Sequence, residues 1–516
     1  MRMSIKSSLS CANFVNLSEP KQSYSRIMKS SSLIGGAQGI NILIGMVRIK
    51  FVAVLIGPLG VGLAGTYQAL IGFIGTFAGL GLQGSAVRDV AEAVGSQDDE
   101  RVGRTILTLR RMCWLSGLSG TALVAVFSGP LSQLTFGSLE HRWDIALVGT
   151  TILLTNIKGG QMALIQGKRR IADIAKLNVI GVAVGSVISV GLYFWLGVDG
   201  VVPAIVLLGL TNLLASWWFA SKISVPKVSM TWGESFRTAG GMVKLGLALM
   251  LNMLLVSGVA FATRALIAAD LSLVAVGVYG AAFNLSGMIV NIVLQAMGAD
   301  YYPSLTAVNN DHSKMRNLVN EQTEVGLLLA LPAILAVIVF APWMIKLFYT
   351  SEFTDAVILL QIFSLGCLGR VTSWPLGFII LALGRAKVFA ATETLTNVVH
   401  IVLIVIGLKC LELVGVALAF AGLYVFYVGF MLILSKKMIG FSWSRPVVRM
   451  LSWVLPVVGL GFAQSVSLPL LASTIIGSVA VGVVSLICLR GLVCRLGPEN
   501  SVCQMLARLP LFRHLA

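Results

Sequence analysis

The chain has 516 residues, of which 57% are hydrophobic and only 11% are charged, and its mean hydropathy is +0.91. Soluble domains carry about 25% charged residues, so the low charge content excludes a soluble fold. Apolar runs of roughly 20 residues, the length that crosses a bilayer, recur along almost the whole chain. The formal charge of +17 is typical of a membrane protein whose cytoplasmic loops accumulate Lys and Arg. The composition therefore predicts an all-α polytopic membrane protein.

The chain begins with a polar stretch. Residues 1–30 form a predicted cytoplasmic extension, and residues 1–27 have neither the long apolar region nor the cleavage site of a signal peptide. Met28 lies directly before the first apolar run and would make a natural translation start. Residues 1–27 are then either a translated extension or an artefact of the assigned start.

Apolar runs between polar or Gly/Pro breaks predict about fourteen transmembrane helices. In chain order they cover residues 31–56, 64–87, 108–130, 144–166, 172–195, 200–221, 244–269, 275–299, 322–347, 356–382, 388–409, 413–435, 447–465 and 468–489. A Gly57–Pro58 pair separates the first two, as expected for residues that end helices. All outer connections are short, which leaves no room for an external catalytic domain.

Loop charges predict how the helices are oriented. Most of the 38 Lys and Arg residues fall in the loops on the side of the N-terminus, and the loops on the other side hold only Arg142, Lys346 and Lys409. Because Lys and Arg accumulate on the cytoplasmic side, we expect both termini in the cytoplasm.

An internal repeat relates the two halves of the chain. "VGLAGTYQAL" (61–70) matches "VGVYGAAFNL" (276–285), which aligns Gly62 with Gly277. "QGKRR" (166–170) later matches "LGRAK" (383–387) in the same order. The repeat unit holds six helices, an even number, so both copies enter the membrane from the same side, as parallel repeats do.

The repeat predicts two pseudo-symmetric six-helix lobes plus two C-terminal helices. The predicted domains are an N-lobe over 31–221, a cytoplasmic inter-lobe linker over 222–243, a C-lobe over 244–435, two added helices over 447–489 and a cytoplasmic tail over 490–516. Such a plan is typical of transporters with a central cavity between the lobes.

The residues from 31 to 82, "SSLIGGAQGINILIGMVRIKFVAVLIGPLGVGLAGTYQALIGFIGTFAGLGL", resemble the N-terminus of Wzx-type O-antigen translocases and lipid III flippases. These proteins belong to the MATE-like multidrug/oligosaccharidyl-lipid/polysaccharide (MOP) exporter superfamily. The resemblance rests on the basic residue in the first span, the "GPLGVGLAG" turn and the glycine-rich second span. The length and the six-plus-six plan extend it over nearly the whole chain from residue 28.

The resemblance implies a flippase rather than an enzyme. Its substrate would be an undecaprenyl-diphosphate-linked oligosaccharide, an O-antigen or other surface-polysaccharide repeat unit of lipopolysaccharide biosynthesis. It would cross from the cytoplasmic to the periplasmic leaflet of the bacterial inner membrane by alternating access through a cationic cavity. The implied partners are membrane lipids, a coupling ion (H⁺ or Na⁺), and the polymerase and chain-length regulator of the same pathway. Lys50 matches the family's basic position in the first span.

Six cations fall inside the predicted spans: Arg48, Lys50, Lys158, Lys176, Arg264 and Arg370. A cation at the bilayer centre costs about 2.5–3.5 kcal/mol on insertion scales, so it is expected to face a cavity or a partner. We expect five of them, all but Lys176, to bind substrate in a central cavity. Lys176 is one turn into its span and three residues after Asp173, which favours an interfacial or salt-bridged role.

Depth and repeat symmetry distinguish the remaining five. Arg370 is about 21 Å into its span at 1.5 Å per residue, and Arg48 and Arg264 occupy corresponding positions of the two lobes. Arg48 and Lys50 are two residues apart and so about 200° apart around a helix; they cannot point the same way. The repeat favours Arg48 for the cavity and the family resemblance favours Lys50.

Acidic residues decide between classes of transporter. Asp173, Asp199, Asp270, Asp300 and Asp355 all lie at predicted span ends. A MATE-like cation-coupled antiporter of small molecules, the main alternative, would need carboxylates in the N-lobe core. A membrane glycan polymerase, the other alternative, would need acidic catalytic pairs or a large loop. Cations with few acids suit a diphosphate, which Arg binds in bidentate fashion.

Polar residues in the spans are candidates for glycan contacts, although interhelical hydrogen bonds are an equal alternative. These candidates are Tyr67, Gln68, Asn252, Asn284 and Asn291. The seven cysteines have no CxxC spacing and the four histidines are scattered, so neither a metal site nor a cofactor is predicted.

Overall fold

The computed structural model describes residues 18–96 and 98–496, and this part of the chain is almost entirely helical, without a strand. Eight helical stretches in it are long and apolar enough to cross a membrane. Three of them, Gly36–Ala78, Ile171–Ser221 and Ala386–Ile439, are 43, 51 and 54 residues long, about twice what one crossing needs. The polytopic helical fold is thus confirmed, and the number fourteen stays a prediction.

The first half of the chain forms seven α-helices and one short 3₁₀ helix. They are α1 (Ser18–Ala78), α2 (Leu82–Gly95), α3 (Asp99–Val126), α4 (Ser128–Phe136), α5 (Arg142–Gly167), α6 (Ile171–Leu196), η1 (Gly197–Gly200) and α7 (Val201–Ser221). The predicted extension is helical from Ser18 onward, and residues 1–17 lie outside the described part.

The second half is built in the same way. Its elements are α8 (Trp232–Asp270), α9 (Leu273–Ala307), α10 (His312–Phe348), η2 (Ser351–Phe353), α11 (Ala356–Ala382), α12 (Ala386–Ile439), α13 (Arg445–Ser467) and α14 (Leu470–Leu496). Of the predicted tail, residues 497–516 lie outside the described part.

Two helices are broken where the sequence predicts a boundary. In α1 the backbone turns sharply at Gly57, whose φ of 59° is a left-handed value that glycine adopts without a side-chain penalty, and Pro58 starts the second leg with its fixed φ. In α12 the break lies at Leu411 and Glu412, between the predicted spans 388–409 and 413–435. Both predicted boundaries are confirmed.

One predicted span is interrupted, so the prediction of a single helix there is wrong. The range 64–87 was expected to be a single helix, but α1 ends at Ala78 and α2 begins at Leu82. Leu80 and Gly81 between them have positive φ values of 49° and 63°. The apolar run continues through this turn, so hydropathy alone does not mark it.

The predicted linker 222–243 is only partly an extended connection. Its second part is the start of α8, which runs on without a break to Asp270. Thr231 caps this helix in a capping box: its Oγ1 accepts from the N–H of Glu234, and Glu234 Oε2 accepts from the N–H of Thr231 at 2.8 Å. These hydrogen bonds hold the pKa of Glu234 below its usual value. The start of α8 is therefore fixed inside the predicted linker.

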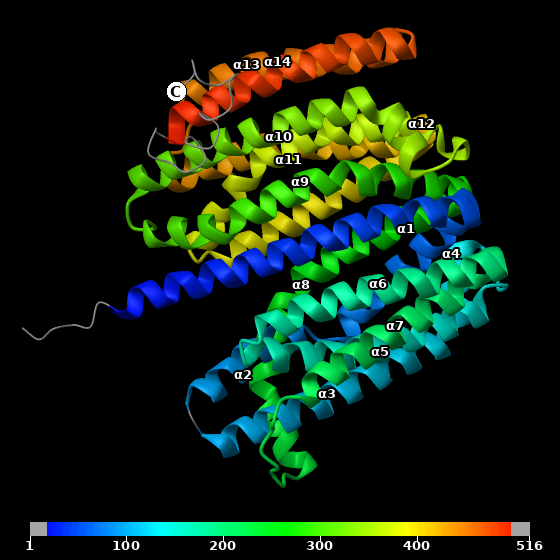
Figure 1. The fold of residues 1–516 in the computed structure, drawn as a ribbon, viewed down its shortest axis with the longest axis vertical. Coiled ribbons are helices and arrows are strands. Elements are labelled where there is room, and N and C mark those ends of the chain that lie inside the picture. Colours follow the sequence, from blue (N-terminus) through cyan, green and yellow to red (C-terminus); the bar gives the residue numbers. More distant parts are fainter. Residues whose placement is uncertain (1–17, 97, 497–516) are drawn as a thin grey trace, which may run out of the picture.

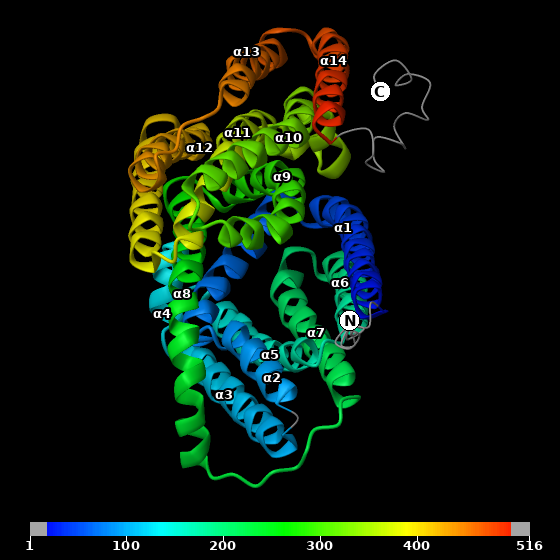
Figure 2. The same ribbon diagram turned by 90° about the vertical axis from the view of Figure 1, so that its left-hand side faces the viewer.

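The helices gather in two groups, shown one above the other in Figure 2. Helices α2–α7 form one group, with apolar cores that contain Val124, Ile152 and Leu164. Helices α9–α12 form the other, whose larger core contains Phe363 and Leu331 and is covered on one side by α13 and α14. The helices α1 and α8 run between the groups and contact both.

The bundle has two ends, which we name by what they carry. At the termini end lie the start of α1 and the end of α14, on the left in Figure 1. At the kink end lie the bend of α1, which is at Gly57, and the α4–α5 loop, on the right. The first and last described helices thus begin and finish at the same end, as expected for an even number of crossings.

Candidate functional site

Helix α1 meets the second group at a pair of glycines near the kink end. A Cβ added to Gly62 of α1 would lie 1.9 Å from the carbonyl oxygen of Leu273, and one added to Gly277 of α9 would lie 2.0 Å from that of Pro58. No side chain fits at either position, so the two backbones touch. Gly62 and Gly277 are the residues that the internal repeat aligns, so each half contributes the same position to this contact.

Lys50 adds a polar contact between α1 and the second group. Its Nζ donates to the carbonyl oxygen of Lys346 at 2.9 Å and to that of Tyr349. Both carbonyls belong to the last turn and C-cap of α10, where helices leave carbonyls unpaired and carry partial negative charge. Lys50 therefore joins the first leg of α1 to the end of α10.

Arg48 and Arg264 lie on other helix pairs. Arg48 acts electrostatically on Tyr193 of α6, whereas Lys50 reaches the end of α10, so the two cations have different neighbours. Arg264 of α8 donates to the carbonyl of Ala260 at 2.9 Å and lies over the ring of Tyr279 in α9, with 5.6 Å from Cζ to the ring centroid. A Cβ at Gly65 would be 3.7 Å from its Nε, which places Arg264 one turn below the Gly62–Gly277 contact.

Lys158 and Arg370 lie deeper in each group. The Lys158 ammonium donates to Asn212 Oδ1 at 3.0 Å, which joins α5 to α7. Arg370 of α11 is close to Tyr424 of α12 and to Cys367. Both side chains are half-buried. The five predicted cations thus occupy five different helix contacts, and no hydrogen bond among the described residues joins two of them.

The ion pairs of the described residues avoid all five cations. They are Arg101–Glu92, Arg104–Glu100, His141–Asp144, Arg170–Asp173, Lys314–Asp311 and Arg495–Glu324. Five of these pairs lie toward the termini end, and His141–Asp144 lies at the kink end. Within residues 18–96 and 98–496, Arg48, Lys50, Lys158, Arg264 and Arg370 therefore have no carboxylate partner, which leaves their charge uncompensated.

The predicted glycan contacts differ in exposure. Gln68 and Asn284 are exposed on the second leg of α1 and on α9, and Asn291 is half-buried. Asn252 of α8 has a buried Oδ1 without a hydrogen-bond partner, which leaves one acceptor free for a hydroxyl. Tyr67 is fully buried, and its hydroxyl donates to Asp144 Oδ2 at 2.8 Å.

The polar cluster around Tyr67 is one that sequence reasoning missed. Tyr67 Oη also lies 3.0 Å from His141 Nδ1, and that nitrogen lies 3.1 Å from Asp144 Oδ2. His141 and Asp144 sit three residues apart where α5 begins. This His-x-x-Asp spacing after Gly137 was the available signal, but scattered histidines gave no reason to pair it with a tyrosine 74 positions away.

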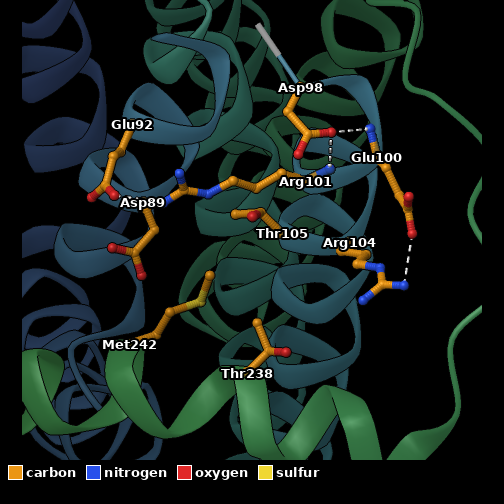
Figure 3. A pocket seen from close by; sticks show the side chains of 9 residues that line it. All are labelled: Asp89, Glu92, Asp98, Glu100, Arg101, Arg104, Thr105, Thr238 and Met242. Carbon is orange, nitrogen blue, oxygen red and sulfur yellow. Dashed lines mark hydrogen bonds and ion pairs between the residues drawn. The ribbon is translucent and has the colours of Figure 1, made fainter. Parts of the chain in front are cut away.

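A cavity of about 600 Å³ opens at the termini end between α2, α3 and α8 (Figure 3). Its lining consists of Asp89, Glu92, Asp98, Glu100, Arg101, Arg104, Thr105, Thr238 and Met242. Partial burial raises the pKa of the Asp89 carboxyl. Carboxylates outnumber guanidinium groups on this wall, and both arginines are paired, so the cavity is a poor site for an anion.

Hydrogen bonds from α3 hold the start of α8 beside this cavity. Arg111 of α3 donates to the carbonyls of Met230 and Thr231, both at 2.9 Å, and to Ser235 Oγ at 2.6 Å, and it stacks over the ring of Trp232. The connection between the two groups is therefore anchored to the first of them.

Comparisons with known proteins agree with this architecture. The family model for "polysaccharide biosynthesis protein" matches residues 51–358, more than half of the chain. The lipid III flippase of Escherichia coli is 23% identical over 387 residues, which cover 71% of this chain and 88% of that protein. A probable low-salt glycan biosynthesis flippase of Haloferax volcanii is 24% identical over 379 residues, 72% of this chain and 76% of that protein.

Solved structures show the same fold. A multidrug resistance transporter of the MATE family, in an inward-facing conformation, has a TM-score of 0.63 at 15% identity, covering 78% of this chain and 94% of that one. The lipid II flippase MurJ, in an inward closed conformation, has a TM-score of 0.58 at 15% identity, covering 89% and 99%. The predicted MATE-like transporter fold is thereby confirmed.

Proposed function

Because this chain belongs to the polysaccharide biosynthesis protein family, we propose that it is a flippase for a lipid-linked oligosaccharide. The relatives whose names state a function are flippases and not enzymes. We take the carrier to be undecaprenyl diphosphate and the direction to be from the cytoplasmic to the periplasmic leaflet of the inner membrane. The glycan would be a repeat unit of O-antigen or another surface polysaccharide.

One observation carries the choice of an anionic substrate: five intramembrane cations have no carboxylate partner among the described residues. A bare cation in a membrane segment is costly, and an anionic substrate would offset this cost when it binds. Arg48, Arg264 and Arg370 can each hold two oxygens of a diphosphate at once, whereas Lys50 and Lys158 act as point charges. Asn252, Asn284, Asn291 and Gln68 supply groups for sugar hydroxyls.

The closed contact at the kink end supports alternating access. We propose that the N-lobe (31–221) and the C-lobe (244–435) rock against each other about Gly62 and Gly277, with 222–243 as the connection and 447–489 as added helices. With both termini in the cytoplasm, the state described here would be closed toward the periplasm. A coupling ion would drive the cycle, and the polymerase and chain-length regulator of the pathway would use its product.

Surface-glycan display in cells that lack their own flippase tests this function. The chain should restore display, and Arg264→Ala, Arg370→Ala and Lys158→Ala should each lower it by at least about tenfold, the effect of losing about 1.4 kcal/mol of substrate binding. Lys176→Ala is the matched control, because Lys176 is an exposed cation on α6 and should leave display intact. Equal display by all four variants at equal protein levels would exclude the cationic site.

A further inference from the structure

The two legs of α12 touch near their break and separate at their other ends. The break lies at Leu411 and Glu412 and divides the helix into the legs 386–410 and 413–439. Close to it, a Cβ added to Gly407 or Gly415 would overlap the carbonyl group of the other glycine, so the two backbones are in contact. At the far ends of the legs a groove of about 340 Å³ opens between them.

The walls of this groove are apolar. On each leg the apolar lining residues recur at helical spacing, so each leg turns one stripe of them toward the other. These residues are Val388, Ala391 and Leu395 on the first leg and Phe430 and Leu434 on the second. Thr392 also lines the groove, but its hydroxyl donates to the carbonyl of Val388 at 2.8 Å. The walls therefore suit a hydrocarbon chain.

Each apolar stripe ends in a lysine. Lys387 lines the groove and lies one turn before Ala391. On the second leg, Lys437 follows Phe430 by seven residues and Leu434 by three, so it lies on the same helix face as both. Both lysines are exposed, and neither belongs to an ion pair within residues 18–96 and 98–496. Two uncompensated ammonium groups thus lie at one end of an apolar groove.

This end of the groove is at the membrane surface on the termini end. Helix α11 begins after η2, whose Glu352 lies against Gly57 at the kink end, and it runs to Ala382 at the opposite end, where α12 starts. The predicted spans of the two legs begin at 388 and end at 435. Lys387 and Lys437 therefore lie just outside the apolar spans, at the level of the lipid headgroups.

We propose that this groove, which we call the α12 groove, binds one anionic phospholipid of the leaflet at the termini end. One acyl chain lies between the two legs, and the phosphate lies against Lys387 and Lys437. The inference goes beyond the proposed function and does not depend on it, because neither lysine is among the five cations assigned to the substrate.

Charge complementarity carries the choice of occupant. Basic pockets between membrane helices on the cytoplasmic side are typical sites for anionic headgroups, and a lysine holds a phosphate oxygen as a point charge. A zwitterionic lipid brings a cation of its own, so its headgroup gains less from two ammonium groups. A free phosphate has no chain to fill the apolar part. An anionic phospholipid satisfies both parts of the site at once.

Native mass spectrometry of the full-length protein in detergent tests the headgroup. Phosphatidylglycerol should bind at least about fivefold more tightly than phosphatidylcholine with the same acyl chains. Lys387→Gln and Lys437→Gln should each lower the affinity for phosphatidylglycerol about fivefold and leave that for phosphatidylcholine unchanged. Lys244→Gln is the control, because Lys244 is an exposed cation of α8. Equal affinity for the two lipids, or an equal loss in Lys244→Gln, would overturn the proposal.

Ala391→Trp tests the groove while it keeps both lysines. Ala391 is exposed, so the larger side chain enters the groove and not the core, and the affinity for phosphatidylglycerol should fall by more than about tenfold. Val425→Trp is the matched control, because Val425 is exposed and lies nine residues before Leu434, on the opposite face of the second leg. Unchanged affinity in Ala391→Trp would show that no chain occupies the groove and would refute the site.

The isoprenoid carrier is the rival occupant, since it also joins a hydrocarbon chain to phosphate. Undecaprenyl phosphate added at the same concentration as phosphatidylglycerol separates the two. Phosphatidylglycerol that stays bound supports the phospholipid site. Its displacement from the wild type, together with loss of undecaprenyl phosphate binding in Ala391→Trp, would assign the groove to the carrier and contradict the proposal.

Discussion

Lys50 and Arg48 are two residues apart on α1 and act on different parts of the molecule. Lys50 donates to two carbonyls at the end of α10, where a cation contributes about 0.3–2 kcal/mol through the helix dipole. Arg48 acts electrostatically on Tyr193 of the first group and has no carboxylate partner in the described residues. We infer that in this conformation Lys50 holds the kink end closed, whereas Arg48 is available to substrate.

Lys50→Met tests this division, since it removes the ammonium and keeps an unbranched chain. Losing about 1 kcal/mol of closing free energy raises the open population about fivefold. A cysteine placed at Gly280, where a side chain meets no atom within 4 Å, should then react with an impermeant maleimide added outside about five times faster. Arg48→Met should leave the labelling rate unchanged and lower glycan display. Identical labelling rates in the two variants would contradict separate roles.

Single residues also show what the sequence could and could not predict about the site. A charge inside an apolar run is visible in the sequence, which is why the sequence predicts all five cations as site residues. Their partners were not predictable, because Lys50 binds backbone carbonyls almost 300 positions away and carbonyls carry no sequence signature. The His141 cluster was missed for a similar reason: its third member comes from another helix.

At the scale of helices, breaks were predictable where chemistry enforces them. Gly57–Pro58 stops the first leg of α1 because proline lacks a donor and glycine tolerates a left-handed φ. The turn at Leu80 and Gly81 escaped prediction, since apolar residues continue through it. The start of α8 inside the predicted linker was likewise hidden, although Thr231 and Glu234 have the spacing of a capping box.

The helix crossing at Gly62 and Gly277 admits a direct test. Gly62→Val adds atoms where a Cβ alone would lie 1.9 Å from a backbone oxygen, so the closed contact cannot form and glycan display should fall by more than about tenfold, the equivalent of about 1.4 kcal/mol. Gly72→Val on the same leg of α1 is the control, because nothing lies within 4 Å of its Cβ position. Wild-type display by Gly62→Val would show that the crossing is dispensable.

At the scale of the whole molecule, the internal repeat predicted two halves, and the structure has two helical groups with their own cores. Repeats reveal which helices are equivalent, but not which of the possible packings of two lobes is adopted. That choice depends on backbone contacts such as Gly62–Gly277 and on Lys50, which hydropathy does not register. The conformation therefore had to come from the structure.

The orientation of the molecule in the membrane can be tested with a native residue. Cys410 is exposed at the break of α12, on the side predicted to be periplasmic, whereas Cys113, Cys367 and Cys488 are buried. An impermeant maleimide should label Cys410 once the outer membrane is permeabilised, and Cys410→Ser should abolish this labelling. Modification of Cys410 only in inside-out vesicles would reverse the predicted orientation.

The glycine contact also determines how far the rest of the molecule can travel. From Gly62 to Ala78 the second leg of α1 is about 24 Å long at 1.5 Å per residue. If the contact is a pivot, a rotation of about 15° there displaces the far end of this leg by about 6 Å, roughly the distance between neighbouring turns of a helix. The contact between the two glycine backbones would thus be a pivot near one end of the bundle, and a small rotation about it would produce a larger displacement at the other end.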